Sequence, residues 1–66
     1  MKIIINGSPK QLDDGADLKA IVRDLCKNPA HVIAELNGTI IAGPDRPGTK
    51  IKDGDAIELV SFVGGG

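Results

Sequence analysis

One segment of the sequence has the repeat of an amphipathic helix, and it limits the folds open to the whole chain. Asp17 is placed to cap the start of this helix, and Asn28-Pro29 is expected to stop it, because the residue before proline is pushed out of the α region. The apolar positions follow at i, i+3, i+4 and i+7 and are Leu18, Ile21, Val22 and Leu25. A single helix buries one apolar stripe, so the other elements must form one surface beneath it.

The rest of the chain is typical of strands joined by tight turns. Asn6-Gly7 and Asn37-Gly38 are favoured two-residue hairpin turns, because both residue types tolerate a positive φ. The strands that these turns join are predicted over residues 1–5, 8–12, 31–36 and 39–42. Residues 43–48 contain two prolines and two glycines, which predicts a loop. A last strand rich in β-branched and apolar residues follows the turn Asp53-Gly54-Asp55.

This order of hairpin, helix, hairpin and strand predicts an α+β fold. The last strand is expected to lie beside the first in the middle of the sheet, parallel to it, so that the sheet is mixed and has four to five strands. One main helix packs across this sheet. The arrangement is a β-grasp, or ubiquitin-like, architecture.

Size and charge exclude several classes of function. The 66 residues allow one domain, predicted over residues 1–63, followed by a flexible glycine tail over 64–66. A net charge of −1 without a basic run does not favour nucleic acid or an anionic membrane as a partner, and no apolar stretch reaches the length of a membrane span. The single cysteine, Cys26, cannot form an internal disulfide, which fits a reducing cytoplasm. We expect a monomer there.

The chain ends on three glycines directly after the last predicted strand. Chain ends rich in glycine are often disordered or serve as linkers. A glycine thread without Cβ atoms could also enter a channel too narrow for other residues, and it would carry the α-carboxylate of Gly66 at its tip. Both interpretations fit the residues taken alone.

The chain lacks a catalytic apparatus of its own. It has no phosphate-binding loop of the G-x-x-x-x-G-K type and no paired His or Cys residues that would suggest a metal site. Asp53 and Asp55 are interpreted as turn formers rather than cation ligands. Cys26 is interpreted as a small, partly buried packing residue, and His31 as structural or exposed. We therefore expect a carrier rather than an enzyme, with no bound cofactor.

Three features together resemble the ThiS family of sulfur-carrier proteins in thiamin biosynthesis. They are the turn Asn37-Gly38, the turn at 53–55 that leads into the last strand, and the end Val63-Gly64-Gly65-Gly66. The resemblance covers the whole chain. One departure lies in the connection before the Asp-Gly-Asp turn, which has Arg46 but lacks the bulky aromatic residue that many members carry.

The resemblance implies that an E1-like, ThiF-type enzyme uses ATP and magnesium to adenylate the Gly66 carboxylate. Sulfur from a persulfide donor then displaces AMP, and a ThiG-type thiazole synthase uses the resulting thiocarboxylate. Gly64 and Gly65 would line the channel of the partner. Unmodified, an ionised terminal carboxylate is a poor electrophile, since its charge repels nucleophiles; adenylation supplies a leaving group.

Two further questions remain open at the level of sequence. The same fold and end suit a sulfur carrier for molybdopterin, cysteine or tRNA thiolation, and also a ubiquitin-like protein modifier or a non-covalent interaction module. Phe62, the only aromatic side chain of the Phe, Tyr and Trp types, either completes the core or is exposed as a docking anchor with Val60. Because side chains alternate along a strand, Val60 and Phe62 point to the opposite face from Ile57 and Leu59.

Overall fold

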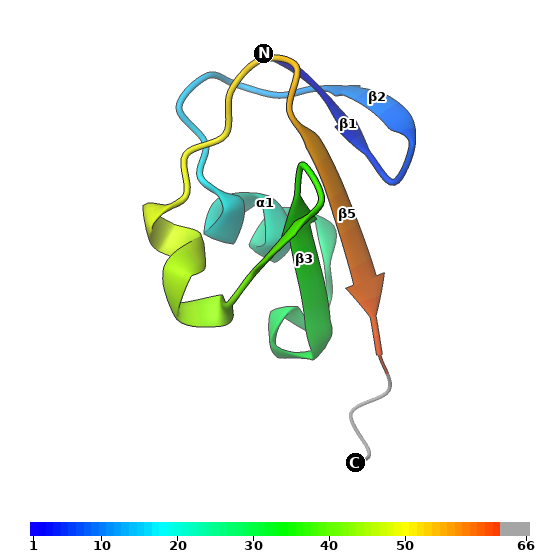
Figure 1. Ribbon diagram of the computed structural model, residues 1–66, viewed down its shortest axis with the longest axis vertical. Helices are drawn as coiled ribbons and strands as arrows, with labels where there is room; N and C mark the ends of the chain where they lie inside the picture. Colours follow the sequence, from blue (N-terminus) through cyan, green and yellow to red (C-terminus); the bar gives the residue numbers. More distant parts are fainter. Residues whose placement is uncertain (63–66) are drawn as a thin grey trace.

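The computed structural model describes residues 1–62, so Val63 and the three glycines lie outside the described residues. A five-stranded mixed sheet in the order β2-β1-β5-β3-β4 packs against one α-helix, α1, over Leu18–Leu25 (Figure 1). The strands are β1 Lys2–Ile5, β2 Ser8–Gln11, β3 Val32–Leu36, β4 Thr39–Ile41 and β5 Ala56–Ser61. The predicted α+β, β-grasp architecture is confirmed.

The last strand, β5, is the centre of the sheet. On one side it pairs in parallel with β1, with Ile4 opposite Ala56. On its other side it pairs antiparallel with β3 along five positions, from Val32 opposite Ser61 to Leu36 opposite Ile57. Pairing with β1 at Ala56 and Ile57, and with β3 from Ile57 along the rest of the strand, fixes the direction of β5 within the sheet (Figure 1).

Both hairpin turns have the conformation that their residues predict. Asn6 and Gly7 have φ values of 50° and 82°, and Asn37 and Gly38 have 50° and 86°. Positive φ at both central residues defines the type I′ turn, whose twist matches that of the two strands it joins. The two Asn-Gly predictions are confirmed.

Helix α1 begins as expected and ends earlier than expected. The carboxylate of Asp17 accepts a hydrogen bond from the Ala20 main-chain N–H at 2.8 Å, so Asp17 is the N-cap. Cys26 is already extended, although its N–H still donates to the carbonyl of Val22 at 2.9 Å. The helix therefore ends at Leu25, before the Asn28-Pro29 stop is reached.

The core lies between the helix and one face of the sheet. Its buried residues are Ile3, Leu18, Ile21, Val22, Val32, Ala34, Ile51 and Ile57. Leu25 is 40% exposed, so its predicted place in this core is wrong. As the last residue of α1, it lines cavities beside the helix instead of lying against the sheet.

Two short 3₁₀ helices replace irregular chain. Pro29–His31 forms one of them, so β3 begins at Val32 rather than at residue 31. Gly43–Gly48, predicted as a loop, forms the other. Proline restricts φ to values that a helical turn also uses, which explains why proline-rich connections can wind into short 3₁₀ turns. In the described part of the chain, no helix has the length and hydropathy to cross a membrane.

The turn before β5 is organised by two carboxylates. Asp55, only 7% exposed, accepts hydrogen bonds from the Lys52 main-chain N–H at 2.8 Å and from Nδ2 of Asn37 at 3.1 Å. Asp53 accepts one from the Lys2 main-chain N–H at 2.6 Å. The interpretation of both residues as turn formers is confirmed, and the described residues contain no cluster of side chains suited to a metal ion.

We expect Asp55 to make the fold sensitive to acid. The Lys52 N–H holds the pKa of this carboxyl below its ordinary value, with help from Asn37 and the Lys52 charge and against the effect of burial. A lowered folded-state pKa gives stability above the unfolded pKa of about 4, and this stability is lost as the pH falls through the folded value.

The substitution Asp55→Asn should therefore lower the free energy of unfolding by about 1–3 kcal/mol at neutral pH, because it weakens hydrogen bonds to a buried charge. The deficit relative to the parent should shrink as the pH is lowered below about 4. Urea melts of the parent and the variant, from neutral pH to below about pH 4, measure this difference in the free energy of unfolding. A constant deficit at every pH would show that Asp55 does not act through its charge.

Candidate functional site

The candidate site is the end of β5, where the chain leaves the sheet. The Phe62 main-chain N–H donates to the carbonyl of His31 at 2.9 Å, so the pairing with the segment before β3 continues past Ser61. The predicted modified residue Gly66 and the predicted channel residues Gly64 and Gly65 lie outside the described residues. The structure describes the strand that carries them.

The asparagines of the two hairpin turns hold β5 from both sides. Oδ1 of Asn6 accepts from the Leu59 N–H at 2.8 Å, and its Nδ2 donates to the Leu59 carbonyl at 3.2 Å. Oδ1 of Asn37 accepts from the Ala56 N–H at 2.9 Å, while its Nδ2 donates to the Asp55 carboxylate. Each amide side chain thus takes the place of a missing main-chain partner.

The sequence predicts both turns, but it does not predict that their asparagine side chains also bind the main chain of β5. Among asparagine, aspartate and glycine, the residues most common in such turns, asparagine alone offers both a donor and an acceptor in its side chain. Asparagine at the first position of both turns was the available signal. Its use depends on which strand lies beside each turn, and this is a property of the assembled sheet.

The two faces of β5 differ as the alternation of its residues predicts. Ile57 is buried and Leu59 is partly buried against the core. Val60 and Phe62 are 51% and 47% exposed, so the open question about Phe62 is answered in favour of exposure. The Phe62 ring lies 5.6 Å from the His31 ring, centroid to centroid, and covers part of that half-buried side chain.

Exposed apolar side chains are concentrated on the face of the sheet that α1 leaves uncovered. We call this surface the open face. The cross-strand register places Ile33 opposite Val60, and Ile4 opposite Ala56 on the next strand pair. The large apolar residues that are at least 40% exposed in the described chain are Ile4, Leu25, Ile33, Ile40, Val60 and Phe62. Leu25 lies on α1 and is the exception. Ile4, Ile33, Ile40 and Val60 belong to the open face, and Phe62 follows β5 in the same two-residue alternation as Val60.

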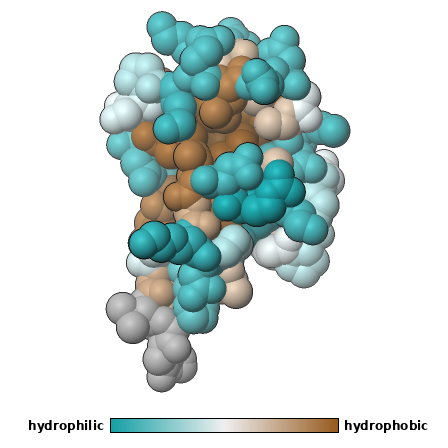
Figure 2. Space-filling model, turned by 180° about the vertical axis from the view of Figure 1, so that it is seen from behind, coloured by the Kyte–Doolittle hydropathy of each residue, from teal (hydrophilic) through white to brown (hydrophobic). Residues whose placement is uncertain are grey.

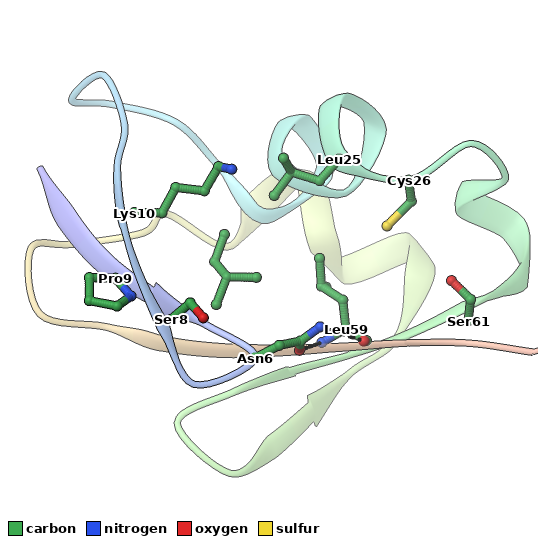
Figure 3. A pocket seen from close by; sticks show the side chains of 9 residues that line it. Asn6, Ser8, Pro9, Lys10, Leu25, Cys26, Leu59 and Ser61 are labelled. Atoms are coloured by element: carbon green, nitrogen blue, oxygen red, sulfur yellow. Dashed lines mark hydrogen bonds between the residues drawn. The ribbon is translucent and has the colours of Figure 1, made fainter.

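A cavity of about 340 Å³ lies on the other side of β5, between the β1–β2 hairpin and the end of α1 (Figure 3). The Cys26 sulfur points into it, and the Ser61 hydroxyl and Lys10 also line it. Seen from behind, the molecule has apolar surface gathered into one region bordered by hydrophilic side chains (Figure 2). Cys26 packs against the core and is half-buried, as predicted; its distance from Gly66 falls outside the described residues.

Arg46 acts within the fold. Its guanidinium donates to the main-chain carbonyls of Pro29 at 3.3 Å and Val32 at 2.5 Å, which ties the second 3₁₀ helix to the start of β3. It is therefore turned inward toward the backbone and is not a free cation on the surface.

Comparisons with known proteins agree along the whole chain. The sequence model of the ThiS family matches residues 3–66. The sulfur carrier protein ThiS of Thermus thermophilus is 31% identical over 62 residues, which cover 94% of this chain and 95% of that protein. A crystal structure of the thiamine biosynthesis protein ThiS from Geobacter metallireducens superposes with a TM-score of 0.86 at 32% identity and covers 100% of both chains.

A thiazole synthase of Paramagnetospirillum magneticum is 30% identical over 66 residues. The match covers 100% of this chain but 20% of that protein, so the chain spans about a fifth of the length of this relative. A region similar to the present chain therefore occurs there within a longer polypeptide. The family match, the fold and the central strand that precedes the glycines agree with one another, and this chain belongs to the ThiS family.

Proposed function

We propose that the carboxylate of Gly66 is adenylated and then converted to a thiocarboxylate, which donates sulfur for thiazole formation. The observation that carries this proposal is the family match through residue 66 on a chain whose last strand pairs with β1 at its start and with β3 along its length, the β3 side continuing as far as Phe62. A strand paired in this way has a fixed direction up to Phe62, the last described residue. A group that must reach an enclosed active site benefits from such orientation.

The chemistry needs a partner enzyme, because the carrier supplies only the acyl group. A carboxylate oxygen attacks the α-phosphorus of ATP and pyrophosphate leaves, with magnesium balancing the phosphate charge on an E1-like, ThiF-type enzyme. The terminal sulfur of a persulfide then attacks the acyl carbon and AMP leaves. A thiol finally cleaves the sulfur–sulfur bond, so that the thiocarboxylate is released and the two thiol sulfurs become a disulfide.

The thiazole synthase from Paramagnetospirillum magneticum supports the choice of acceptor. In that protein, a region similar to this chain and the remaining four fifths belong to one polypeptide. Joining two modules raises their effective concentration toward each other. We propose that a ThiG-type thiazole synthase receives the sulfur from the present carrier.

Intact mass spectrometry of the protein isolated from its own cells tests the proposal. A thiocarboxylate end should increase the mass by the difference between a sulfur and an oxygen atom, about 16 Da. The increase should also appear in vitro with the adenylating enzyme, ATP, magnesium and a persulfide donor, and it should be absent when ATP is omitted. A carrier joined through an amide bond to lysines of other proteins would instead identify a protein modifier.

Phe62 and Val60 are predicted to contact the adenylating enzyme, because both are exposed on the segment that directs the chain end. We expect Phe62→Ala to weaken binding about tenfold or more, as exposed aromatic side chains often anchor interfaces. It should change the free energy of unfolding much less. Titration calorimetry with the adenylating enzyme and urea melts measure the two effects.

Leu25→Ala is the matched control for this prediction, because Leu25 is exposed to a similar extent but is the last residue of α1, away from the open face. It should bind like the parent. Unchanged binding of a folded Phe62→Ala protein would exclude Phe62 from the interface.

A further inference from the structure

Two carboxylates lie directly opposite each other in the middle of the open face. The antiparallel register of β3 and β5 pairs Glu35 with Glu58. Side chains paired in this way project to the same face with Cβ atoms about 5 Å apart. Glu58 is exposed and Glu35 is half-buried, and within residues 1–62 neither forms a salt bridge or a side-chain hydrogen bond. Two like charges are therefore held side by side without a cation.

Apolar side chains border this pair on two sides. Ile40 of β4 is opposite Glu35 and is 66% exposed. Two residues further along the strands, Ile33 is opposite Val60, and both are more than 40% exposed. Like charges placed opposite each other weaken a sheet. The acidic pair thus makes the isolated sheet less stable, while its apolar border would exclude water from an ion pair formed with another molecule.

We propose that the open face binds a protein surface that places an arginine guanidinium between Glu35 and Glu58, next to the exposed apolar side chains of Ile33, Ile40 and Val60. An arginine suits two adjacent carboxylates better than a lysine does, because its planar group has five donors in a fixed fork and is weakly hydrated. The partner is the enzyme that receives the chain end, so the inference rests on the proposed function. It identifies the contact that selects this partner.

The position of Glu58 on β5 connects this contact to the reaction. Eight residues separate Glu58 from Gly66, and an extended chain of that length spans at most about 29 Å. The adenylating site of the partner must therefore lie within that distance of its arginine. Docking on the same strand that carries the glycines determines where they enter the partner.

Charge also disfavours the other occupants of the open face. A second copy of this chain, docked face to face about a two-fold axis, would bring one acidic pair close to another. Nucleic acid and anionic lipids carry the same sign of charge as the pair. A cationic protein surface is the occupant whose charge complements the face.

The test uses Glu35→Gln, Glu58→Gln and the double variant, with Asp13→Asn as the matched control. Asp13 is exposed and lies on the loop after β2, so its substitution removes the same charge away from the open face. The probe is the ThiF-type adenylating enzyme of the same cells. We expect the double variant to bind about 30-fold or more weakly, the loss typical of removing one side of a desolvated charge pair. Asp13→Asn should bind within about twofold of the parent.

Urea melts distinguish an interface role from a structural one. Removing the repulsion should leave the unfolding midpoint of the double variant equal to or above that of the parent, although its binding is weaker. Glu35→Lys provides a second variant: it should form a cross-strand ion pair with Glu58, raise the midpoint and abolish binding. A lower midpoint in the double variant would overturn the proposal, because the carboxylates would then support the fold.

Each remaining outcome separates this inference from the proposed function. If the parent gains sulfur but the glutamine variants bind as it does, the inference fails and the proposed function stands. If binding depends on the two glutamates but the parent never gains sulfur, the docking inference stands and the proposed chemistry fails. Self-association of the parent through the open face, detected by sedimentation and reduced by Val60→Asp, would also overturn the inference.

Discussion

Replacing Ile21 by alanine should lower the free energy of unfolding by about 2–5 kcal/mol. Ile21 is 4% exposed and belongs to the core between α1 and the sheet. Truncation there removes apolar contacts and leaves a cavity that the well-packed neighbours fill only in part. In a domain of this size, whose total stability is of the order of 5 kcal/mol, such a loss approaches global unfolding.

Leu25→Ala provides the control, because Leu25 has the same helical spacing as the core residues but is 40% exposed. Its substitution should cost less than about 1 kcal/mol, since surface positions away from special features contribute little. Urea melts measure both changes, provided that the free energy of unfolding depends on urea concentration with the same slope in both variants and the parent. Equal losses for the two variants would mean that Leu25 packs in solution as its spacing predicts, and a loss below about half a kcal/mol for Ile21→Ala would place the helix face elsewhere.

The order and pairing of the elements could be predicted because the local signals are strong. The capping residue Asp17 and the two Asn-Gly turns each allow few alternative conformations. A single helix then requires one sheet beneath it, and the expected place of the last strand beside the first is observed. Helical spacing alone could not place Leu25, because periodicity identifies a face of the helix but not where along the helix the sheet ends.

The candidate site could be predicted less completely. The two-residue alternation of the last strand correctly predicted that Val60 and Phe62 lie on a different face from Ile57 and Leu59. It could not decide whether the second face is covered, since that depends on whether another layer packs there. The pairing of Glu35 with Glu58 requires the register between two strands that are distant in sequence, and no local signal specifies it.

Function is expected to depend on Gly65 and Gly66 far more than the fold does. Gly65→Val adds a branched side chain and restricts φ and ψ toward the β region, so the chain end should no longer fit a narrow channel. Deleting Gly66 moves the terminal carboxylate back by up to about 3.6 Å. A misplacement of about 1 Å can already cost about 10²-fold in an organised active site, so each variant should form the adenylate and thiocarboxylate at least 10²-fold more slowly.

Both variants should melt like the parent, because the buried core residues found within residues 1–62 run from Ile3 to Ile57, away from the two glycines in the sequence. The measurements are pyrophosphate exchange with the adenylating enzyme, intact mass after addition of the sulfur donor, and a urea melt of each variant. Gly48→Val is the matched control, since a Cβ at Gly48 would meet nothing within 4 Å and the residue is far from the end of β5 in the sequence. Thiocarboxylate formation at the parental rate by Gly65→Val would contradict the narrow channel, and Gly65 would then be an ordinary residue of a chain end.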